Sequence, residues 1–340
     1  MTKRILITGG AGFIGHHLIE YILLHTDWEI ITIDRLDVSG NLNRLHEMLS
    51  GHITANKQRV RFIFHDLRAE LGPQLMHDIG DVNIILHVAA SSHVDRSILY
   101  PLQFVQDNIV GTAHILEYAR KLKNLERLIY FSTDEVFGPA PAGVSYQERD
   151  RYNSTNPYSA TKAAAEELCV AYENTYGLPI YVTHTMNVFG YRQLPEKFIP
   201  RSIFLIKNDL PVIVHSTPEK TKAGSRTYVH VTDVAGAIMF LLTSDIKTLP
   251  DSTGARIPKF NIIGPQEVDN LSLVQWIADV QGKKLKYEMV DFHSSRPGHD
   301  LRYSLSGAYM ESLGWRPTLD LKSHIGNIVN WYINNPRWLE

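Results

Sequence analysis

The sequence contains a single cysteine, Cys169, among its 340 residues. One thiol excludes internal disulfides. Cys169 stands between Leu168 and Val170 in a stretch with a helical pattern, which favours inert packing over nucleophilic chemistry. We therefore assign no role to this thiol.

Long apolar runs and blocks of like charge are also missing. No apolar run reaches the length of about 18 residues that a membrane span needs, and the run near the start is too short for a signal peptide. The 34 Lys and Arg residues nearly balance the 36 Asp and Glu residues, and they form no block that marks a nucleic-acid arm or a membrane-surface helix. We therefore expect a cytoplasmic protein with neither a nucleic-acid nor a membrane partner.

The composition that is present suits a folded globular protein. Hydrophobic residues make up 44% of the chain and charged residues 21%, which is far from the composition of a disordered chain. A length of 340 residues suggests about two domains of ~150 residues each. The chain is long enough to bury a sizeable core.

Short, almost continuously apolar stretches alternate with helical patterns in the first half of the chain. Such stretches are typical of strands that are buried on both faces, as in a parallel sheet. Helical patterns separate them, for example over 12–25 and 102–122. The alternation predicts an α/β fold with a doubly wound parallel sheet, the Rossmann arrangement. The predicted strands are 4–8, 29–34, 60–66, 82–90 and 127–133.

The clearest helix covers 156–177, where Asn156 can cap the start, Pro157 suits the first turn and Gly177 suits the end. From about Asn187 on, Pro and Gly become more frequent and the strands shorter, which indicates a second domain. The stretch 226–242 nevertheless reads as a strand that leads into a buried helix, so the domains can interleave. We expect a first domain over 1–186 with 228–258 returning to it, and a smaller second domain over 187–227 and 259–340.

A glycine turn follows the first predicted strand. "ITGGAGFIG" places Gly9, Gly12 and Gly15 between that strand and the next helix, where backbone amides and the helix N-terminus can hold a pyrophosphate. Asp34 ends the next strand, where a carboxylate can accept hydrogen bonds from the adenosine ribose. This combination predicts a dinucleotide site. Asp34 favours NAD over NADP because its charge repels a 2′-phosphate, although the neighbouring Arg35 works against that inference.

Two carboxylates stand side by side directly after the strand 127–133. In "FSTDEVFG", Ser132 and Thr133 lead into Asp134 and Glu135. Adjacent carboxylates repel each other, so they either mark a strand end that emerges into water or deliver an acid and a base to a site. The strand end alone leaves both readings open.

Tyr158 and Lys162 stand four residues apart on the predicted helix and therefore share a face. The spacing alone is weak, because about one such match arises by chance in a chain with 16 tyrosines, and an exposed pair is the alternative. A phenol with a pKa near 10 needs a downward shift of about 3 units to act as a base at neutral pH. A cationic Lys162 and a positive nicotinamide ring would have to supply most of that shift.

These motifs together resemble the extended short-chain dehydrogenase/reductase family. "GGAGFIG", "STDEVFG" and "YSATK" occur in the family's order, and the resemblance covers essentially the whole chain. The Asp134–Glu135 pair is similar to the signature of nucleotide-sugar 4,6-dehydratases, of which the dTDP-glucose enzymes are members, whereas sugar 4-epimerases usually lack it. Supporting stretches are "DRLDVSGNL", "SHVDRSI", "LPEKFIP" and "RPGHDLRY".

The resemblance implies a reaction and a role for each catalytic group. Tyr158, assisted by Lys162, would take the proton of the sugar 4-hydroxyl while NAD accepts the hydride from carbon 4, and Thr133 would bind the 4-oxygen. Glu135 would then remove the proton at carbon 5, Asp134 would protonate the departing 6-hydroxyl, and the hydride would return to carbon 6. The product would be a nucleotide-linked 4-keto-6-deoxy sugar, and the enzyme a hydro-lyase.

The resemblance also implies the residues that hold cofactor and substrate, and it implies no metal. The first domain would bind NAD and the second the nucleotide sugar, and the helices 102–122 and 156–177 would pair across a homodimer. The implied NAD contacts are Gly9, Gly12, Phe13, Ile14, Gly15, Asp34, Asp66, Leu67, Ala89, Ala90, Tyr158 and Lys162. The implied substrate contacts are Ser92, His93, Asn187, Lys197, Arg226, Asn261, Arg296 and His299.

Several positions depart from the pattern of the dTDP-glucose enzymes. Ser91 stands where that pattern has Glu, Val188 and Tyr191 replace Asn and Pro, and the segment 216–231 replaces a shorter one. The departures leave the hydride chemistry intact and the substrate open: we rank dTDP-glucose first, with a UDP sugar as the alternative. A 4-epimerase or decarboxylase of the same family, and a non-catalytic NAD-binding protein, stay as alternative functions.

Overall fold

A computed structural model describes residues 2–51, 54–246, 257–292 and 301–340. The chain groups into two compact units, each described here by itself. Unit 1 contains Met1–Val136, Asn156–His184 and Ala235–Phe260, and unit 2 contains Phe137–Thr155, Thr185–Val234 and Asn261–Glu340. The segment 137–155, which falls inside the range expected for the first domain, therefore groups with unit 2. Among the described residues, no helix is long and apolar enough to cross a membrane.

A seven-stranded sheet forms the centre of the nucleotide-binding fold, in the order β10-β6-β5-β4-β1-β2-β3. Strand β1 pairs in parallel with both β2 and β4, and β2–β3 and β4–β5 are parallel as well. The order β3-β2-β1-β4-β5-β6 is that of the Rossmann fold, which confirms the predicted fold class. The strands are β1 (Arg4–Thr8), β2 (Glu29–Asp34), β3 (Val60–Phe64), β4 (Ile84–His87), β5 (Arg127–Thr133), β6 (Ile180–Thr185) and β10 (Lys259–Ile262).

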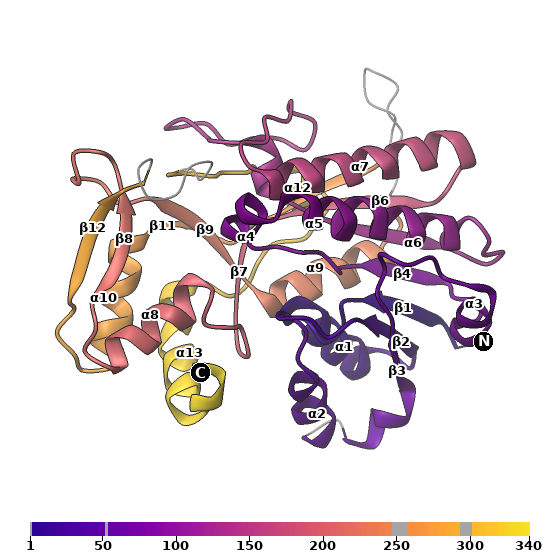
Figure 1. The fold of residues 1–340 in the computed structure, drawn as a ribbon, viewed down its shortest axis with the longest axis horizontal. Coiled ribbons are helices and arrows are strands. Elements are labelled where there is room, and N and C mark those ends of the chain that lie inside the picture. Colours follow the sequence, from indigo (N-terminus) through magenta and orange to yellow (C-terminus); the bar gives the residue numbers. More distant parts are fainter. Residues whose placement is uncertain (1, 52–53, 247–256, 293–300) are drawn as a thin grey trace. The chain divides into compact units, whose positions relative to one another are not determined.

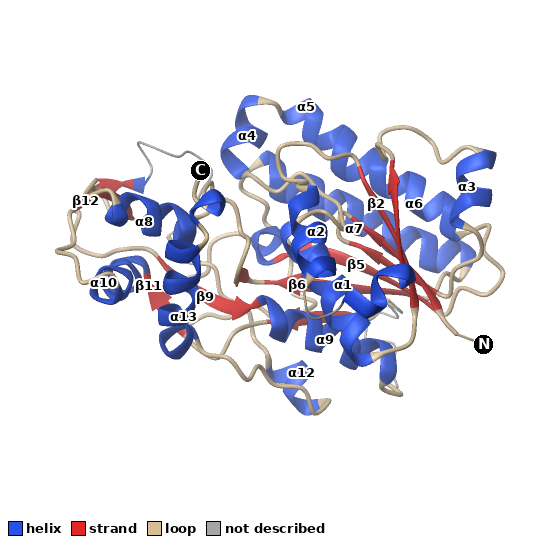
Figure 2. Ribbon diagram, turned by 90° about the horizontal axis from the view of Figure 1, so that it is seen from below, coloured by secondary structure: helices blue, strands red, loops and turns tan. Residues whose placement is uncertain are grey.

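Helices cover both faces of this sheet. Figure 1 shows α6 and α7 on one side of the strands and α1 on the other, and Figure 2 shows the strands between these layers. Ile85 and Leu128 of the sheet pack with Ile115 of α6 and Ala165 of α7 in one apolar core. The helices of this part are α1 (Phe13–His25), α2 (Leu42–Ser50), α3 (Pro73–Ile79), α4 (Val94–Leu99), α5 (Pro101–Phe104), α6 (Gly111–Ala119), α7 (Pro157–Tyr176) and α9 (Val231–Thr243), with short turns η1 (Thr54–Arg59) and η3 (Asp134–Phe137).

The helix expected over 102–122 is interrupted. Between α5 and α6 the residues Val105–Val110 (η2) form a π-helical turn, in which hydrogen bonds run from each residue to the fifth one before it. Such turns are rare and occur often at functional sites. Two polar residues of this turn, Asp107 and Asn108, have buried side chains.

Unit 2 contains two small sheets and its own apolar core. A three-stranded sheet has the order β11-β9-β7, and β8 pairs in parallel with β12. Ile203, Leu273, Ile277 and Ile328 are among the buried residues at the centre of this unit. Its elements are β7 (Asn187–Phe189), α8 (Phe198–Lys207), β8 (Val212–Ser216), β9 (Ser225–His230), β11 (Glu267–Asp269), α10 (Asn270–Val280), β12 (Tyr287–Asp291), α12 (Ala308–Ser312), α13 (Leu321–Asn334) and η4 (Pro336–Trp338).

Candidate active site

The glycine turn closes tightly on its own backbone. Gly9 has φ +74°, the left-handed region that glycine adopts without strain, and a Cβ there would lie 2.9 Å from the Cα of Ala89. A Cβ on Gly15 would lie 2.1 Å from the carbonyl oxygen of Gly9, and one on Gly12 would lie 2.9 Å from the same oxygen. Only glycine therefore fits at these three positions.

Helix α1 begins at Phe13, with Gly12 as its N-cap and no side chain capping it. The first amides of a helix have no partner within the helix, and the helix dipole adds partial positive charge there. Phe13 and Ile14, two of the predicted cofactor contacts, form this first turn and are half-buried. The geometry suits a pyrophosphate.

Asp34 ends β2 beside this turn. Its two carboxylate oxygens accept hydrogen bonds from the amides of Ala11 (3.0 Å) and Leu36 (2.8 Å). Burial raises the pKa of this carboxyl, and the two backbone hydrogen bonds act in the opposite direction. The carboxylate is thus fixed at the end of the strand, next to the glycine turn, where it can accept hydrogen bonds from a ribose.

The remaining predicted cofactor residues follow strands of the same sheet. The amide of Ala89 donates to the Thr8 hydroxyl (3.1 Å), which places it and Ala90 just beyond β4. The carbonyl of Leu67, half-buried, lies 2.7 Å from a ring nitrogen of His114. The Arg68 side chain donates to Oδ2 of Asp66 at 2.9 Å. Burial alone would raise the pKa of Asp66, but Arg68 and Arg35 lower that pKa to about 2. The structure brings these residues to one edge of the sheet.

The acid pair lies at the end of β5, beside the start of α7. Thr133 donates to Asp134 at 3.0 Å and is itself bound by the amide of Glu135 at 3.4 Å. The side-chain amide of Asn156 donates to Glu135 at 3.1 Å. Asp134 is only 5% exposed, so the pair is not a strand end that simply emerges into water.

Asn156 also explains how α7 is placed. It caps the helix, since its side chain accepts from the amide of Ser159, and Ser159 completes a capping box. The cap was predicted from the sequence, but the contact with Glu135 was not. Its signal in the sequence is that Asn156 stands two residues before Tyr158, a predicted catalytic residue. One residue therefore fixes both the helix start and a predicted catalytic carboxylate.

Tyr158 lies in the first turn of α7 and is 8% exposed, packed in a small apolar cluster with Val94 and Phe104. Burial raises the pKa of its phenol, and the negative charges of Glu135 and Asp134 raise it further. A hydrogen bond with Thr133 acts in the opposite direction. The groups of the protein alone thus keep Tyr158 protonated, so a positive charge from elsewhere must assist its ionisation.

Lys162, one turn further along α7, is 4% exposed and lies over the ring of Tyr130, with Nζ 4.3 Å from the ring centre. Burial lowers the pKa of this ammonium group to about 7, although Cys169 and Glu166 act to raise it. The Tyr130 hydroxyl donates to the backbone carbonyl of Lys162 at 3.2 Å. Lys162 is therefore packed against Tyr130 of β5, the strand that leads into the acid pair.

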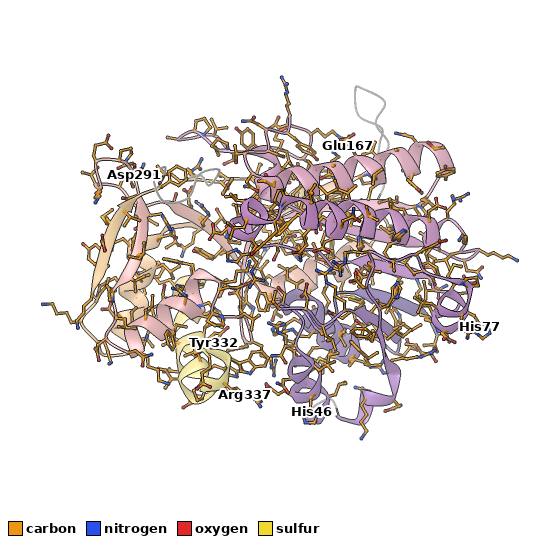
Figure 3. The ribbon with its side chains drawn as sticks, in the orientation of Figure 1. His46, His77, Glu167, Asp291, Tyr332 and Arg337 are labelled. Atoms are coloured by element: carbon orange, nitrogen blue, oxygen red, sulfur yellow. The ribbon has the colours of Figure 1, made fainter. Side chains whose placement is uncertain are left out.

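A buried ion cluster that the sequence did not predict lies behind Lys162. Glu166, which is fully buried, binds His184 of β6 at 3.2 Å and Lys259 of β10 at 2.8 Å. Burial alone would raise the pKa of Glu166, but His184 and Lys259 hold it well below its usual range. The next residue, Glu167, is exposed on the outer side of α7 (Figure 3). The available signal was that Glu166 lies one turn after Lys162, on the same face.

His87 is a second buried polar residue that the sequence did not single out. Its ring nitrogens lie 2.8 Å from the Thr8 hydroxyl and 2.9 Å from the Thr112 hydroxyl. Burial, assisted by the charge of Lys162, lowers the pKa of His87 to about 3, so the ring is neutral at physiological pH. It connects β1, β4 and α6 beneath the site. Cys169 is fully buried and burial raises the pKa of its thiol, as inert packing requires.

The predicted substrate residues divide between the two units. In unit 1, Ser92 is exposed and His93 is the half-buried N-cap of α4. In unit 2, Asn187 begins β7 and is exposed, and Lys197 is the N-cap of α8. Arg296 and His299 lie outside the described residues.

Two further substrate residues of unit 2 are occupied by backbone contacts. The Asn261 amide, fully buried, donates to the carbonyls of Tyr146 (3.2 Å) and Ser306 (3.1 Å). Arg226 donates to the carbonyl of Leu301 at 2.7 Å and lies 4.7 Å from the ring centre of Tyr303. Both residues therefore tie segments of unit 2 together, and their contact with substrate stays a prediction. Among the described residues, no group of three or more His, Cys, Asp and Glu side chains is placed to hold a metal.

Known proteins resemble this chain over nearly its whole length. A family model described as GDP-mannose 4,6 dehydratase matches residues 6–328. The dTDP-glucose 4,6-dehydratase of Escherichia coli is 34% identical, over 98% of this chain and 95% of that protein, and the enzyme of Bos taurus is 33% identical, over 98% and 89%. The crystal structure of DesIV, a dTDP-glucose 4,6-dehydratase of Streptomyces venezuelae with NAD bound, matches with a TM-score of 0.86 and 31% identity, over 99% of this chain and 100% of that one. The chain therefore belongs to the GDP-mannose 4,6 dehydratase family, and its resemblance to the extended short-chain dehydrogenase/reductases that dehydrate nucleotide sugars is confirmed.

Proposed function

We propose that this protein is an NAD-dependent nucleotide-sugar 4,6-dehydratase, which converts a nucleotide-linked hexose to the 4-keto-6-deoxy sugar with loss of water. One observation carries the proposal: Thr133, Asp134 and Glu135 lie at the end of β5, and Glu135 accepts a hydrogen bond from Asn156, the N-cap of the helix α7 that carries Tyr158 and Lys162. Hydride chemistry at carbon 4 needs Tyr158 and Lys162, and elimination across carbons 5 and 6 needs a base and an acid. All of these groups are present at one edge of the sheet.

The glycine turn and Asp34 fit NAD. The turn admits no side chain at Gly9, Gly12 or Gly15, helix α1 starts beside it, and Asp34 is fixed next to it. When bound, NAD supplies the site that takes up the hydride from carbon 4 and gives it back at carbon 6. Its nicotinamide would also supply the positive charge that assists ionisation of the buried Tyr158 phenol.

The chain's own residues then handle the protons. Tyr158 accepts the proton of the 4-hydroxyl, with Lys162 stabilising the phenolate and Thr133 hydrogen-bonding the 4-oxygen. Glu135, oriented by Asn156, removes the proton at carbon 5, which the 4-ketone has made acidic. Asp134 donates a proton to the 6-hydroxyl, so that water leaves. A proton then returns to carbon 5, and the atoms balance as substrate minus water.

We rank dTDP-glucose first among substrates. The curated relatives of similar length bear the name of dTDP-glucose 4,6-dehydratases, and this chain keeps "LPEKFIP" and "RPGHDLRY". Unit 2, with Asn187, Lys197 and Arg226, is the proposed nucleotide-sugar domain. A UDP sugar is the alternative, because Ser91, Val188 and Tyr191 depart from the pattern.

A product assay separates the candidate functions. The protein is incubated with dTDP-glucose and with UDP-glucose, and the products are weighed by mass spectrometry. A dehydratase yields a product lighter by one water, and an epimerase yields a different sugar of unchanged mass. A decarboxylase reacts only when a uronic acid such as UDP-glucuronic acid is added, and then yields a product lighter by carbon dioxide, whereas a non-catalytic NAD-binding protein converts none of these sugars. An unchanged mass with full turnover at carbon 4 would overturn the dehydratase assignment.

We also propose a homodimer that pairs α6 and α7 with the same helices of a second copy. Ala163, Ala164 and Leu168 are only partly buried and Ala171 is exposed, so α7 carries apolar residues beyond its core face. Multi-angle light scattering at micromolar concentration should give twice the chain mass of 38.6 kDa, and a monomer would refute the pairing. The cytoplasmic location stays a prediction.

A further inference from the structure

The residue after Asp34 is a cation, and its surroundings decide which dinucleotide the site accepts. An arginine beside the adenosine ribose suits a 2′-phosphate, because its planar fork of donors matches phosphate oxygens. An aspartate at the same place suits a free 2′-hydroxyl. The sequence places both groups side by side, so the pair alone does not fix the preference between NAD and NADP.

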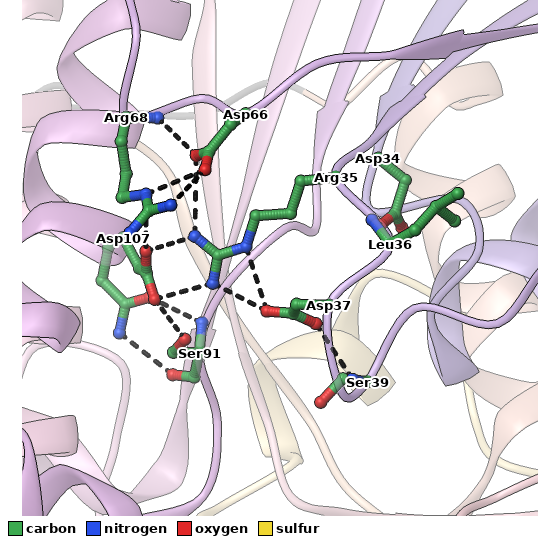
Figure 4. A network of polar contacts seen from close by, with 10 residues as sticks. Asp34, Arg35, Leu36, Asp37, Ser39, Asp66, Arg68, Ser91 and Asp107 are labelled. Atoms are coloured by element: carbon green, nitrogen blue, oxygen red, sulfur yellow. Dashed lines mark hydrogen bonds and ion pairs between the residues drawn. The ribbon is translucent and has the colours of Figure 1, made fainter.

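Carboxylates surround the Arg35 guanidinium in the structure (Figure 4). Nε and Nη2 donate to Asp37 at 3.0 and 2.7 Å, and Nη2 also donates to Asp107 at 2.8 Å. Nη1 donates to the other oxygen of Asp107 and lies 3.6 Å from Asp66. Every nitrogen of the guanidinium therefore faces an acid of the chain itself.

Asp107 comes from a segment 72 residues away and is rigidly held. It lies in the π-helical turn η2, its side chain is 3% exposed, and it accepts a hydrogen bond from the hydroxyl of Ser91 at 2.6 Å. Asn108 in turn binds the amide and carbonyl of Ser91, at 2.8 and 3.1 Å. Ser91 is the position at which the dTDP-glucose pattern has Glu, and in this chain its hydroxyl and backbone hold Asp107 and Asn108.

The loop on the other side is held as well. Leu36 has φ +56°, a left-handed conformation that costs a residue with a side chain of order 1 kcal/mol or more. Its amide is bound by Asp34, which keeps it there. The residue directly after Arg35 is therefore fixed in position. The Arg35 side chain itself is only 18% exposed.

The charges around the predicted ribose site at Asp34 do not favour the 2′-phosphate of NADP. Four carboxylates (Asp34, Asp37, Asp66 and Asp107) face three guanidiniums (Arg35, Arg68 and Arg44). Arg44 is itself buried and donates to the carbonyls of Ala11 and Ser39. A phosphate monoester would add about −1.5 to −2 charges to a cluster that is already net negative.

We propose that Asp107, held by Ser91, determines the preference of this protein for NAD over NADP, because it binds Arg35 and keeps that cation from pairing with a 2′-phosphate. This inference rests on the proposed function of the glycine turn and Asp34 as the dinucleotide site. It assigns a specificity role to a residue more than 70 positions from the ribose-binding strand. Asp107 acts through Arg35 and does not need to touch the cofactor.

The test is a binding cycle on protein from which bound dinucleotide has been removed. Dissociation constants for NADH and NADPH are measured by the fluorescence of the reduced nicotinamide, for the unmodified protein, Asp107→Asn, Arg35→Gln and the double variant. Asp107→Asn should lower the ratio of the NADPH to the NADH constant by about tenfold or more, the scale of one charge-assisted contact. Arg35→Gln alone should not lower the ratio, and in the double variant it should restore the original ratio. Asp27→Asn, an exposed acid of the same unit, is the control for the loss of one charge.

The outcomes distinguish this inference from the function it rests on. A folded Asp107→Asn variant with an unmoved ratio would overturn it, and so would a double variant whose ratio stays as low as that of Asp107→Asn. If circular dichroism shows that Asp107→Asn does not fold, Ser91→Ala, which removes only the hydroxyl that holds Asp107, should lower the ratio by a smaller factor of about 2 to 4; an unmoved ratio there counts against the inference. Failure of the unmodified protein to bind NADH would overturn the proposed function itself.

Discussion

Removing Lys259 from its buried pair with Glu166 should destabilise the nucleotide-binding unit strongly. Glu166 is fully buried, Lys259 Nζ lies 2.8 Å from it, and the Lys259 side chain is 12% exposed. Breaking a buried ion pair by deleting one partner costs about 3 to 5 kcal/mol, and His184 at 3.2 Å retains part of the compensation. We therefore expect Lys259→Met to lower the free energy of unfolding by about 3 kcal/mol.

The matched control is Lys3→Met. Lys3 binds Glu126 at 2.5 Å in the same unit, but the two side chains are 37% and 48% exposed. An exposed pair contributes about 0 to 1 kcal/mol. Thermal unfolding followed by circular dichroism, with saturating NAD for all proteins, should show a decrease in Tm of about 6 to 12 °C for Lys259→Met and of at most about 3 °C for Lys3→Met.

The pH dependence gives an independent check of the cause. The pKa of Glu166 is below its ordinary value in the folded state, so its contribution to stability is present above the unfolded pKa of about 4.3 and is lost as the pH falls through the folded pKa. The difference between the unmodified protein and Lys259→Met should therefore be full at pH 7 and shrink below about pH 4. Equal Tm values for the two lysine variants, or a difference that does not change with pH, would refute the reasoning.

Three further predictions concern the site. Glu135→Gln should lower product formation by about 100-fold or more while reduced cofactor accumulates on the enzyme, because oxidation at carbon 4 does not need Glu135; absorbance of the reduced nicotinamide measures this, and its absence in a folded variant contradicts the role. Tyr158→Phe should abolish both the accumulation and the product, and reduced cofactor formed by this variant would exclude Tyr158 as the base. Gly15→Ala should lose NAD binding, because the new Cβ would lie 2.1 Å from the carbonyl oxygen of Gly9; calorimetric titration with NAD measures this, and an unchanged Kd would count against the tight turn as the pyrophosphate site.

The strands were the most predictable part of the molecule. Parallel strands buried on both faces are continuously apolar, and the bounds of β1, β2 and β5 agree with those predicted from the sequence. Strand β4 ends at His87, earlier than predicted, although the apolar residues continue to Ala90. The reason is that the amides of Val88 and Ala89 donate to the Thr8 hydroxyl and leave the ladder.

The grouping of the acid pair with Tyr158 was also predictable. The carboxyl ends of parallel strands and the starts of the following helices meet at one edge of the sheet, so a motif at the end of β5 and another at the start of α7 must be close. The hydrogen bond from Asn156, the N-cap of α7, to Glu135 agrees with this reasoning. The π-helical turn Val105–Val110 was not predictable, because an extra residue in a helix turn leaves the apolar pattern over 102–122 almost unchanged.

The long-range ion pairs could not be predicted from the sequence. Glu166 meets His184 and Lys259 only because α7 packs where β6 and β10 are neighbours, and the position of β10 at the edge of the sheet is a property of the complete fold. Arg35 likewise meets Asp107, which lies 72 residues further along the chain in the π-helical turn. A charged residue on a helix usually faces water. Glu166 and Asp107 are exceptions, because each is buried and forms ion pairs with residues that are distant in the sequence.

The most direct test of the proposed reaction follows one hydrogen through a single turnover cycle. dTDP-glucose with deuterium at carbon 4 is incubated with the unmodified protein, and the label in the product is located by NMR. Because Tyr158 and Lys162 act at carbon 4 while Asp134 and Glu135 act at carbons 6 and 5, a dehydratase should deliver the deuterium to carbon 6 of the same molecule, with loss of one water. Label that remains at carbon 4 in a product of unchanged mass would contradict the account and assign Asp134 and Glu135 to binding alone.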